Sequence, residues 1–169
     1  MNLTIRDADL RDALAIATIQ VEASQAAYRH IFPPGSSTIV VQDRILVWEG
    51  IITRTECHQR VLVAEASGDI CGYVHLGRCR DDDQTLGAGE LYSIYVAKTA
   101  WRSGIGRSLL QAGTAHLVKA GFETATLWVL AANDRARGFY ERYGWWCDGT
   151  ERSVDVGVTE VRYRTTFGQ

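Results

Sequence analysis

Residues 90–110 read ELYSIYVAKTAWRSGIGRSLL, and this stretch decides the fold. An apolar strand runs into a short loop, and the loop opens a helix through Gly104 and Gly106, which lack Cβ atoms and let an oxyanion approach the backbone. The first amides of a helix have no partners within the helix and lie at the positive end of its dipole. Arg102 and Arg107 can add charge-assisted contacts. The junction therefore predicts a site for a phosphate or pyrophosphate.

A Gly-x-Gly motif is weak support by itself, because a tight turn before a closely packed helix needs the same glycines. Two common phosphate motifs are absent. The chain has no Gly-Lys-Ser/Thr of a P-loop, and Leu109 stands where a dinucleotide fingerprint has its third glycine. We therefore expect neither a P-loop nor a dinucleotide-binding site here.

The elements around this junction predict a single α+β domain over residues 1–169, in the order βααβββαβαββ. A first helix follows the caps at 7–9, with apolar residues at spacings of three and four from Leu10 and Leu14 onwards, and it stops at the Pro-Pro-Gly of residues 33–35. The expected strands are 3–6, 60–66, 70–80, 90–96, 124–131, 145–150 and 158–167. The other expected helices are about 37–53, 104–119 and 133–143.

Composition narrows the class of protein. The formal net charge is −2, with acidic and basic residues interspersed, so the basic patch that nucleic-acid binding requires is missing. The N-terminal residues lack the cationic start and apolar centre of a signal peptide, and the longest apolar run, 127–132, is too short to span a bilayer. We therefore expect a cytoplasmic protein that binds neither nucleic acid nor membrane.

The cysteines predict neither a metal site nor a disulfide framework. All four are scattered, without a CxxC pair or a histidine at ligand spacing. Buried free thiols in a reducing compartment are the simplest interpretation. The four are Cys57, Cys71, Cys79 and Cys147.

A second informative segment, residues 133–145, reads NDRARGFYERYGW. Ala136, Phe139 with Tyr140, and Tyr143 fall on one helical stripe, which indicates a buried face. Phe139 is expected in the core. Tyr140 differs, because a buried hydroxyl needs a hydrogen-bond partner.

Together the two segments resemble motifs A and B of the GNAT acetyltransferase superfamily. They occur in the family's order and about thirty residues apart. The family pattern is Gln/Arg-x-x-Gly-x-Gly/Ala followed by Asn-x-x-Ala-x-x-Phe-Tyr-x-x-x-Gly-Phe. This chain departs from it at Trp101, in the Gln/Arg position, and at Trp145, in place of the last Phe. The resemblance implies the acyl-CoA N-acyltransferase fold, a mixed, mostly antiparallel sheet of about seven strands flanked by about four helices.

The same resemblance implies acetyl-CoA as co-substrate, with no metal. The strand at 94–96 would offer backbone groups to the pantetheine arm, and the amides of 102–107 would hold the pyrophosphate. Asn133 and Tyr140 would lie beside the pantetheine and the thioester. The implied cofactor-binding residues are Ile94, Tyr95, Val96, Arg102, Ser103, Gly104, Ile105, Gly106, Arg107, Asn133 and Tyr140.

Acetyl transfer to an amine sets the catalytic requirements. A free amine of pKa ~10.4 is neutral in only about one molecule per few thousand at pH 7, so a base is needed. The resemblance places Tyr140 as the acid that protonates the CoA thiolate. Glu90, at the start of the motif A strand, is the expected base, acting through water. The alternative for Glu90 is a solvated carboxylate.

Other residues are candidates for the acceptor pocket. The resemblance places Tyr28 in the wall between the first two helices, and Tyr92 lies beside Glu90 on the strand. His75 is a further candidate, although a packed or surface histidine is the simpler interpretation. The acidic loop 81–83 either attracts a cationic acceptor or is solvated.

These residues favour an N-acetyltransferase that acetylates a primary amine, with a small molecule preferred because no peptide groove is evident. A protein N-terminus or lysine remains an alternative acceptor. A non-catalytic acyl-CoA sensor on the same fold is a second interpretation, and a structural domain, in which the aromatic residues form an interface, is a third. Pure binding needs neither Tyr140 nor Glu90, so their presence favours catalysis. The resemblance also allows a homodimer.

Overall fold

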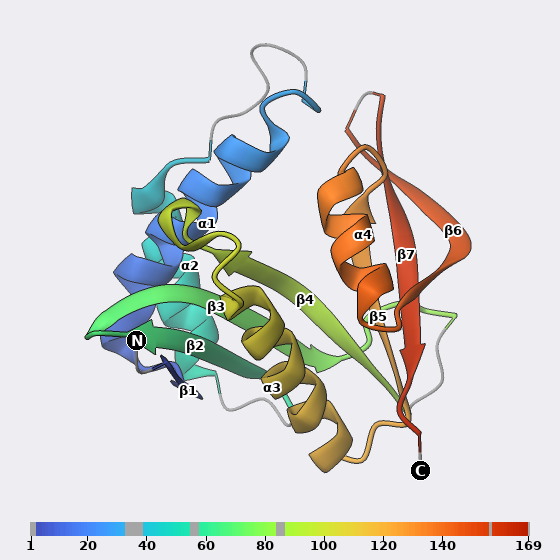
Figure 1. Cartoon of the computed structure of the whole chain (residues 1–169), viewed down its shortest axis with the longest axis horizontal. Coiled ribbons are helices and arrows are strands. Elements are labelled where there is room, and N and C mark those ends of the chain that lie inside the picture. The colour runs from blue at the N-terminus through green and yellow to red at the C-terminus, as the bar shows by residue number, and fades with distance from the viewer. Residues whose placement is uncertain (1–2, 33–38, 55–57, 84–86, 156, 169) are drawn as a thin grey trace.

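A computed structural model describes residues 3–32, 39–54, 58–83, 87–155 and 157–168 (Figure 1). Seven strands form one sheet in the order β1-β2-β3-β4-β5-β7-β6. All neighbouring strands are antiparallel except β4 and β5. The expected mixed, mostly antiparallel sheet is therefore confirmed. The strands are β1 (Leu3–Asp7), β2 (Arg60–Ala66), β3 (Asp69–Arg78), β4 (Ala88–Val96), β5 (Thr124–Leu130), β6 (Trp146–Asp155) and β7 (Val158–Thr166).

The helices divide between the two faces of the sheet. Val61 and Val63 of β2 pack toward α1 and α2, whereas Leu62 and Ala64 pack toward α3, as the period of two in a strand requires. Helix α4 shares the α3 side and lies against β5 and β7 (Figure 1). The helices are α1 (Ala13–Tyr28), α2 (Val41–Thr53), α3 (Ile105–Lys119) and α4 (Asp134–Arg142), with short 3-10 turns η1 (Leu10–Asp12) and η2 (Lys98–Ala100).

The start of the first helix differs from the prediction. Asp9 caps the turn η1 through its side chain, and the regular helix α1 begins only at Ala13. Leu10 and Leu14 were expected on the buried face, but they are 53% and 57% exposed. The expected start of the second helix near residue 37 lies outside the described residues, and so does the Pro-Pro-Gly at 33–35.

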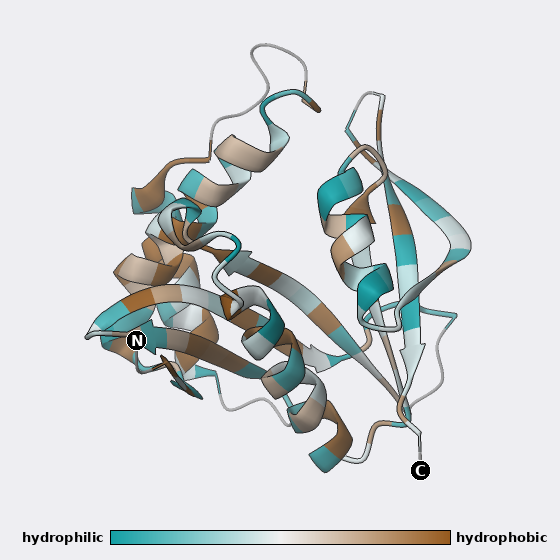
Figure 2. Cartoon of the chain, viewed as in Figure 1, coloured by the Kyte–Doolittle hydropathy of each residue, from teal (hydrophilic) through white to brown (hydrophobic). Residues whose placement is uncertain are grey.

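Strand β6 is longer than predicted and ends at Asp155 instead of residue 150. It is an edge strand and most of its residues are exposed, so the alternation of apolar and polar residues that marks a half-buried strand is missing. Figure 2 shows hydrophilic residues spread over β6 and α4, and hydrophobic residues concentrated on β2, β3 and β4. Strand β6 pairs with β7 as far as Asp155, which lies opposite Val158, and this pairing extends β6.

Candidate active site

The central feature of the molecule is a cleft of about 1220 Å³ between β4 and β5. The two parallel strands pair only from Ala88 to Leu91, opposite 124–127, and then separate. Beyond Leu91, β4 stays paired with β3 on one side, while its other edge faces the cleft. Buried or half-buried backbone groups need partners, so this edge, which has no strand beside it, is suited to bind an extended amide-containing chain.

Most of the predicted site residues do line this cleft. They come from α1, β4, the turn before α3, and α4. The predicted residues in the lining are Tyr28, Tyr92, Ile94, Tyr95, Val96, Arg102, Gly104, Gly106, Arg107, Asn133 and Tyr140.

The N-terminus of α3 forms one end of the cleft. Gly104 precedes the helix with φ of 89°, a left-handed conformation that glycine adopts without steric cost. A Cβ atom on Gly106 would lie 3.7 Å from Phe139 and from Val96, an ordinary contact distance. Ser103 and Ile105 do not line the cleft with their side chains. The Ser103 hydroxyl donates to the carbonyl of Ala100 at 2.6 Å, and the Ile105 side chain is buried in the core.

Trp101 stands where the family pattern has Gln or Arg, and it contacts both sides of the cleft. Its indole Nε1 donates to the carbonyl of Val96 at 2.8 Å, which ties the turn to the end of β4. The guanidinium carbon of Arg135, on α4, lies 3.7 Å from the centre of the Trp101 ring. Sequence reasoning did not identify Arg135, because a stacked arginine leaves no spacing signal.

Tyr140 is buried and reaches the cleft from α4. The rings of Phe139 and Trp145 lie 5.4 and 6.3 Å from its own. This burial raises the pKa of Tyr140, so its hydroxyl stays protonated at neutral pH and can donate a proton or hydrogen bond. Asn133 caps α4 by accepting from the amide of Ala136 at 3.2 Å, and its NH₂ group remains a donor on the same side.

Glu90 lies apart from the cleft lining and is only 2% exposed. Arg80 holds its carboxylate with three hydrogen bonds. The backbone amide and Nε of Arg80 lie 2.9 and 3.0 Å from Oε2, and Nη2 lies 2.5 Å from Oε1. The alternative of a solvated carboxylate is therefore wrong, because the side chain is buried and paired. A proton transfer to Glu90 would need a relay from the cleft.

His75 is enclosed behind the cleft instead of lining it. Its Nε2 lies 2.7 Å from the side-chain nitrogen of Gln59, and its ring lies 5.5 Å from Trp48 and 4.7 Å from Tyr92. Burial lowers the pKa of His75 to about 4, so the imidazole is neutral at neutral pH. These contacts favour a packing role over substrate contact.

Tyr92 and Tyr28 form part of the cleft wall. The Tyr92 hydroxyl donates to the carbonyl of Arg78 at 2.7 Å, and the guanidinium carbon of Arg80 lies 4.0 Å above its ring. The hydroxyls of Tyr28 and Tyr95 lie 3.1 Å apart, which joins α1 to β4. The aromatic wall is therefore held by hydrogen bonds on both sides.

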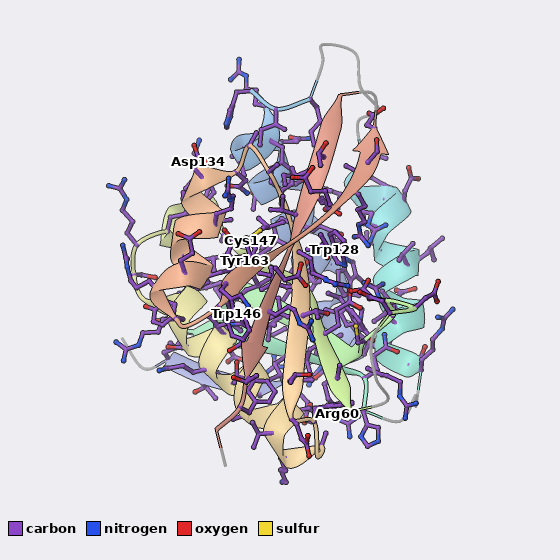
Figure 3. All side chains as sticks on the ribbon, turned by 90° about the vertical axis from the view of Figure 1, so that its right-hand side faces the viewer. Arg60, Trp128, Asp134, Trp146, Cys147 and Tyr163 are labelled. Carbon is purple, nitrogen blue, oxygen red and sulfur yellow. The ribbon has the colours of Figure 1, made fainter. Side chains whose placement is uncertain are left out.

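The acidic loop at 81–83 is neither solvated as a whole nor free to attract an acceptor. Arg162 of β7 is 4% exposed and forms ion pairs with Asp83 at 2.7 Å, Asp81 at 3.2 Å and Asp148 at 2.7 Å. Asp81 also accepts from Nε1 of Trp128, a cleft residue labelled in Figure 3. A buried arginine requires counter-charges, and these aspartates provide them.

Comparison with known proteins agrees with this geometry. The family model of the GNAT acetyltransferases matches residues 21–145. The chain belongs to the GNAT acetyltransferase family. This acetyltransferase is 29% identical over 143 residues to the uncharacterised N-acetyltransferase YuaI of Bacillus subtilis (strain 168), covering 83% of the chain and 79% of that protein.

Two further relatives are informative for this acetyltransferase. It is 36% identical over 103 residues to a mycothiol acetyltransferase of Propionibacterium freudenreichii subsp. shermanii, covering 60% of the chain but only 31% of that protein. The solved structure of the PaiA N-acetyltransferase from Thermoplasma acidophilum, a complex with coenzyme A, superposes with a TM-score of 0.80. That pair is 18% identical and covers 99% of this chain and 100% of the other, which shows a shared fold.

The cleft also includes residues that the sequence analysis did not assign to the site. Phe32, Trp128, Asp155 and Glu160 line the cleft. Glu160 is held by Arg152 at 2.8 Å. All four lie outside both motifs. Asp155 and Glu160 come from the β6–β7 hairpin, Trp128 comes from β5, and Phe32 follows α1.

The remaining expectations concern metals and membranes. In the described ranges, no group of His, Cys, Asp or Glu side chains is arranged to hold a metal ion. No helix among the described residues is long and apolar enough to cross a membrane. Cys71, Cys79 and Cys147 are free thiols, and Cys57 lies outside the described residues.

Proposed function

We propose that this protein transfers an acetyl group directly from acetyl-CoA to a primary amine of a small molecule. The observation that carries the proposal is the cleft between β4 and β5, which joins the open N-terminus of α3 to the hydroxyl of Tyr140. An acyl-CoA sensor would need the first of these features only. Acetyl-CoA supplies an activated acyl group, and the residues of this chain bind and orient it.

The residues present fit such a donor. Residues at the start of α3 line the cleft, and the amides of a helix N-terminus suit the pyrophosphate. The edge of β4 that faces the cleft at 94–96, apart from the Val96 carbonyl that Trp101 binds, suits the amides of the pantetheine arm. An amide of this stretch can donate to the thioester oxygen as it becomes negative. The Asn133 amide group can hold the same arm from α4.

Two proton movements accompany the transfer. A bond forms between the amine nitrogen and the acetyl carbon, the carbon–sulfur bond breaks, and the amine loses a proton while the thiolate gains one. Tyr140 is proposed to donate to the departing thiolate, because its hydroxyl is protonated and reaches the cleft. This assignment gives the buried hydroxyl a partner during the reaction.

The proton of the ammonium group requires a base, and Glu90 is the proposed acceptor through water. The contacts of Glu90 with Arg80 also support a second role, because Arg80 lies over the ring of Tyr92 in the cleft wall. As a base, Glu90 would contribute mainly to kcat. As a positioning residue, it would change the KM for the amine instead.

A small cationic amine is the proposed acceptor. The acceptor end combines the aromatic rings of Tyr28, Phe32 and Tyr92 with the carboxylates of Asp155 and Glu160. Aromatic faces and carboxylates both attract ammonium groups. This combination supports an amine acceptor and offers little to an anionic one.

The proposal is tested with purified protein, acetyl-CoA and a panel of small amines and short peptides, by measuring thiol release and product mass. Acetyl-CoA at about 100 times its Kd should add about 2.7 kcal/mol to the stability, or roughly 5–10 °C to the melting temperature. We expect this rise together with amine-dependent thiol release. A rise without any acetylated product would indicate a sensor, and no rise would refute the donor site.

A further inference from the structure

Four arginines line the donor side of the cleft without a carboxylate partner among the described residues. Arg102 and Arg107 come from the start of α3, and Arg135 and Arg142 come from α4. Elsewhere in the fold, arginines such as Arg80 and Arg162 each pair with a carboxylate. Arg102 and Arg135 thus bring two like charges to one cleft. Such an arrangement is stabilised when an anion binds.

Arg135 differs from the other three because an aromatic ring holds it in place. Its guanidinium lies 3.7 Å from the centre of the Trp101 ring, and Trp101 is itself fixed by its hydrogen bond to Val96. The two residues come from opposite sides of the cleft, since Trp101 precedes α3 and Arg135 begins α4 (Figure 1). Asp134, labelled in Figure 3, marks the end of α4 from which Arg135 extends.

We propose that Arg135 binds a phosphate group of CoA, with Trp101 as the platform that positions its guanidinium across the cleft. This inference rests on the proposed acetyl-CoA-dependent function. A guanidinium stacked on an indole keeps its N–H edge free, and that planar edge matches a phosphate. The tryptophan at the Gln/Arg position thus replaces the direct contact of a polar side chain by a contact through Arg135.

The chemistry of the site favours a phosphate over a carboxylate ligand. Arg135 and Arg102 line the same cleft as the first residues of α3, whose amides lack partners within the helix, so one cleft offers several donors to an anion. CoA carries phosphates in two places, in the pyrophosphate and at the 3′ position of the ribose. Ligands that lack the 3′-phosphate, or that lack both this phosphate and the pyrophosphate, show which of the two groups Arg135 binds.

The test measures dissociation constants of the wild type and of Arg135→Ala for CoA, 3′-dephospho-CoA and pantetheine. The control is Lys119→Ala, which removes an exposed positive charge from the other end of α3 and from outside the cleft lining. We expect Arg135→Ala to weaken CoA binding about 10- to 100-fold, as for loss of a hydrogen bond to a charged group. Lys119→Ala should bind CoA as the wild type does.

The three ligands separate the outcomes. A loss seen with CoA but not with 3′-dephospho-CoA places Arg135 on the 3′-phosphate, and a loss seen with both places it on the pyrophosphate. Binding of CoA by Arg135→Ala within about twofold of the control would overturn the proposal, and so would an equal loss for pantetheine, which has no phosphate. If the wild type binds no CoA, the proposed function itself fails.

A double-mutant cycle tests the platform. In a Trp101→Leu background the guanidinium loses its support, so Arg135→Ala should cost less affinity than it does in the wild type. Equal losses in both backgrounds would show that Trp101 does not position Arg135. Arg135 is exposed, so melting temperatures without ligand should be unchanged by Arg135→Ala.

Discussion

Replacing Tyr140 by phenylalanine removes one hydroxyl from the candidate active site and leaves the ring in place. The ring packs among Phe139, Trp145 and Tyr163, and phenylalanine keeps these contacts. The unfolding temperature of Tyr140→Phe should therefore stay close to that of the wild type. Any change in turnover then reports on the hydroxyl itself.

The expected decrease in kcat follows from the pKa values of the Tyr140 hydroxyl and the CoA thiol. Burial raises the pKa of Tyr140 above its ordinary value of about 10, whereas a thiol such as that of CoA lies near 8.5. Complete proton transfer is thus uphill by at least about 1.5 pKa units, or roughly 2 kcal/mol. The hydroxyl contributes mainly through a hydrogen bond to the developing thiolate, which is worth about 1.5–3 kcal/mol. We therefore expect kcat to fall about 10- to 100-fold.

The assay is steady-state thiol release at saturating amine, with KM for acetyl-CoA determined in parallel. KM should change little, because the hydrogen bond strengthens only as the thiolate forms. Tyr163→Phe is the matched control. The Tyr163 hydroxyl donates to Glu141 at 2.6 Å outside the cleft lining, so its loss should lower stability by about 1–2 kcal/mol and leave kcat unchanged. A kcat for Tyr140→Phe within twofold of the wild type would refute the assignment.

Further predictions concern binding, catalysis and stability. Gly106→Glu should fold, because its Cβ meets only ordinary contacts, and should lose CoA affinity by at least about tenfold in calorimetry; unchanged affinity would contradict the pyrophosphate site. At Gly104 the positive φ would add strain to the same test. Glu90→Gln should lower kcat more than it raises the KM for the amine, because it removes the proposed base, and a raised KM with kcat unchanged would instead indicate a positioning role through Arg80. The pKa of His75 is lowered to about 4 in the folded state, so its contribution to stability is complete above about pH 6.5 and is lost as the pH falls toward 4; a urea titration series should show a decrease of at most about 3 kcal/mol that His75→Phe lacks. Arg162→Ala should lower the free energy of unfolding by about 3–5 kcal/mol, because it leaves carboxylates without their counter-charge, and a loss under 1 kcal/mol would show that water replaces it.

The strands and helices follow largely from local sequence patterns. The apolar, β-branched run at 60–66 predicts β2, and the helix expected from 104 to 119, ended by Gly121, matches α3 to within a residue or two. The patterns fail where packing is absent. Leu10 and Leu14 continue the helical period but remain exposed, and β6 lacks alternation because it lies at the sheet edge. Periodicity reports burial, so it says little about exposed elements.

The proposed donor site could be predicted from the sequence alone. Backbone amides at a helix N-terminus bind a phosphate through local geometry, and residues 102–107 carry that geometry in their glycines. Asn133 caps α4 within its own segment, which is equally local. Such features can be predicted because all their atoms lie within one turn of chain.

Only the tertiary structure decided which charges meet. Glu90 is bound by Arg80, Asp81 and Asp83 are bound by Arg162, and Arg135 lies on Trp101 across the cleft. Each partner comes from another element of the fold. The sequence contains other residues of the same charge that could have formed each pair, so it does not indicate which ones meet. Burial selects among them, because a charge removed from water must find its counter-charge or ring within a few ångströms, and that distance is set by the packing of the strands.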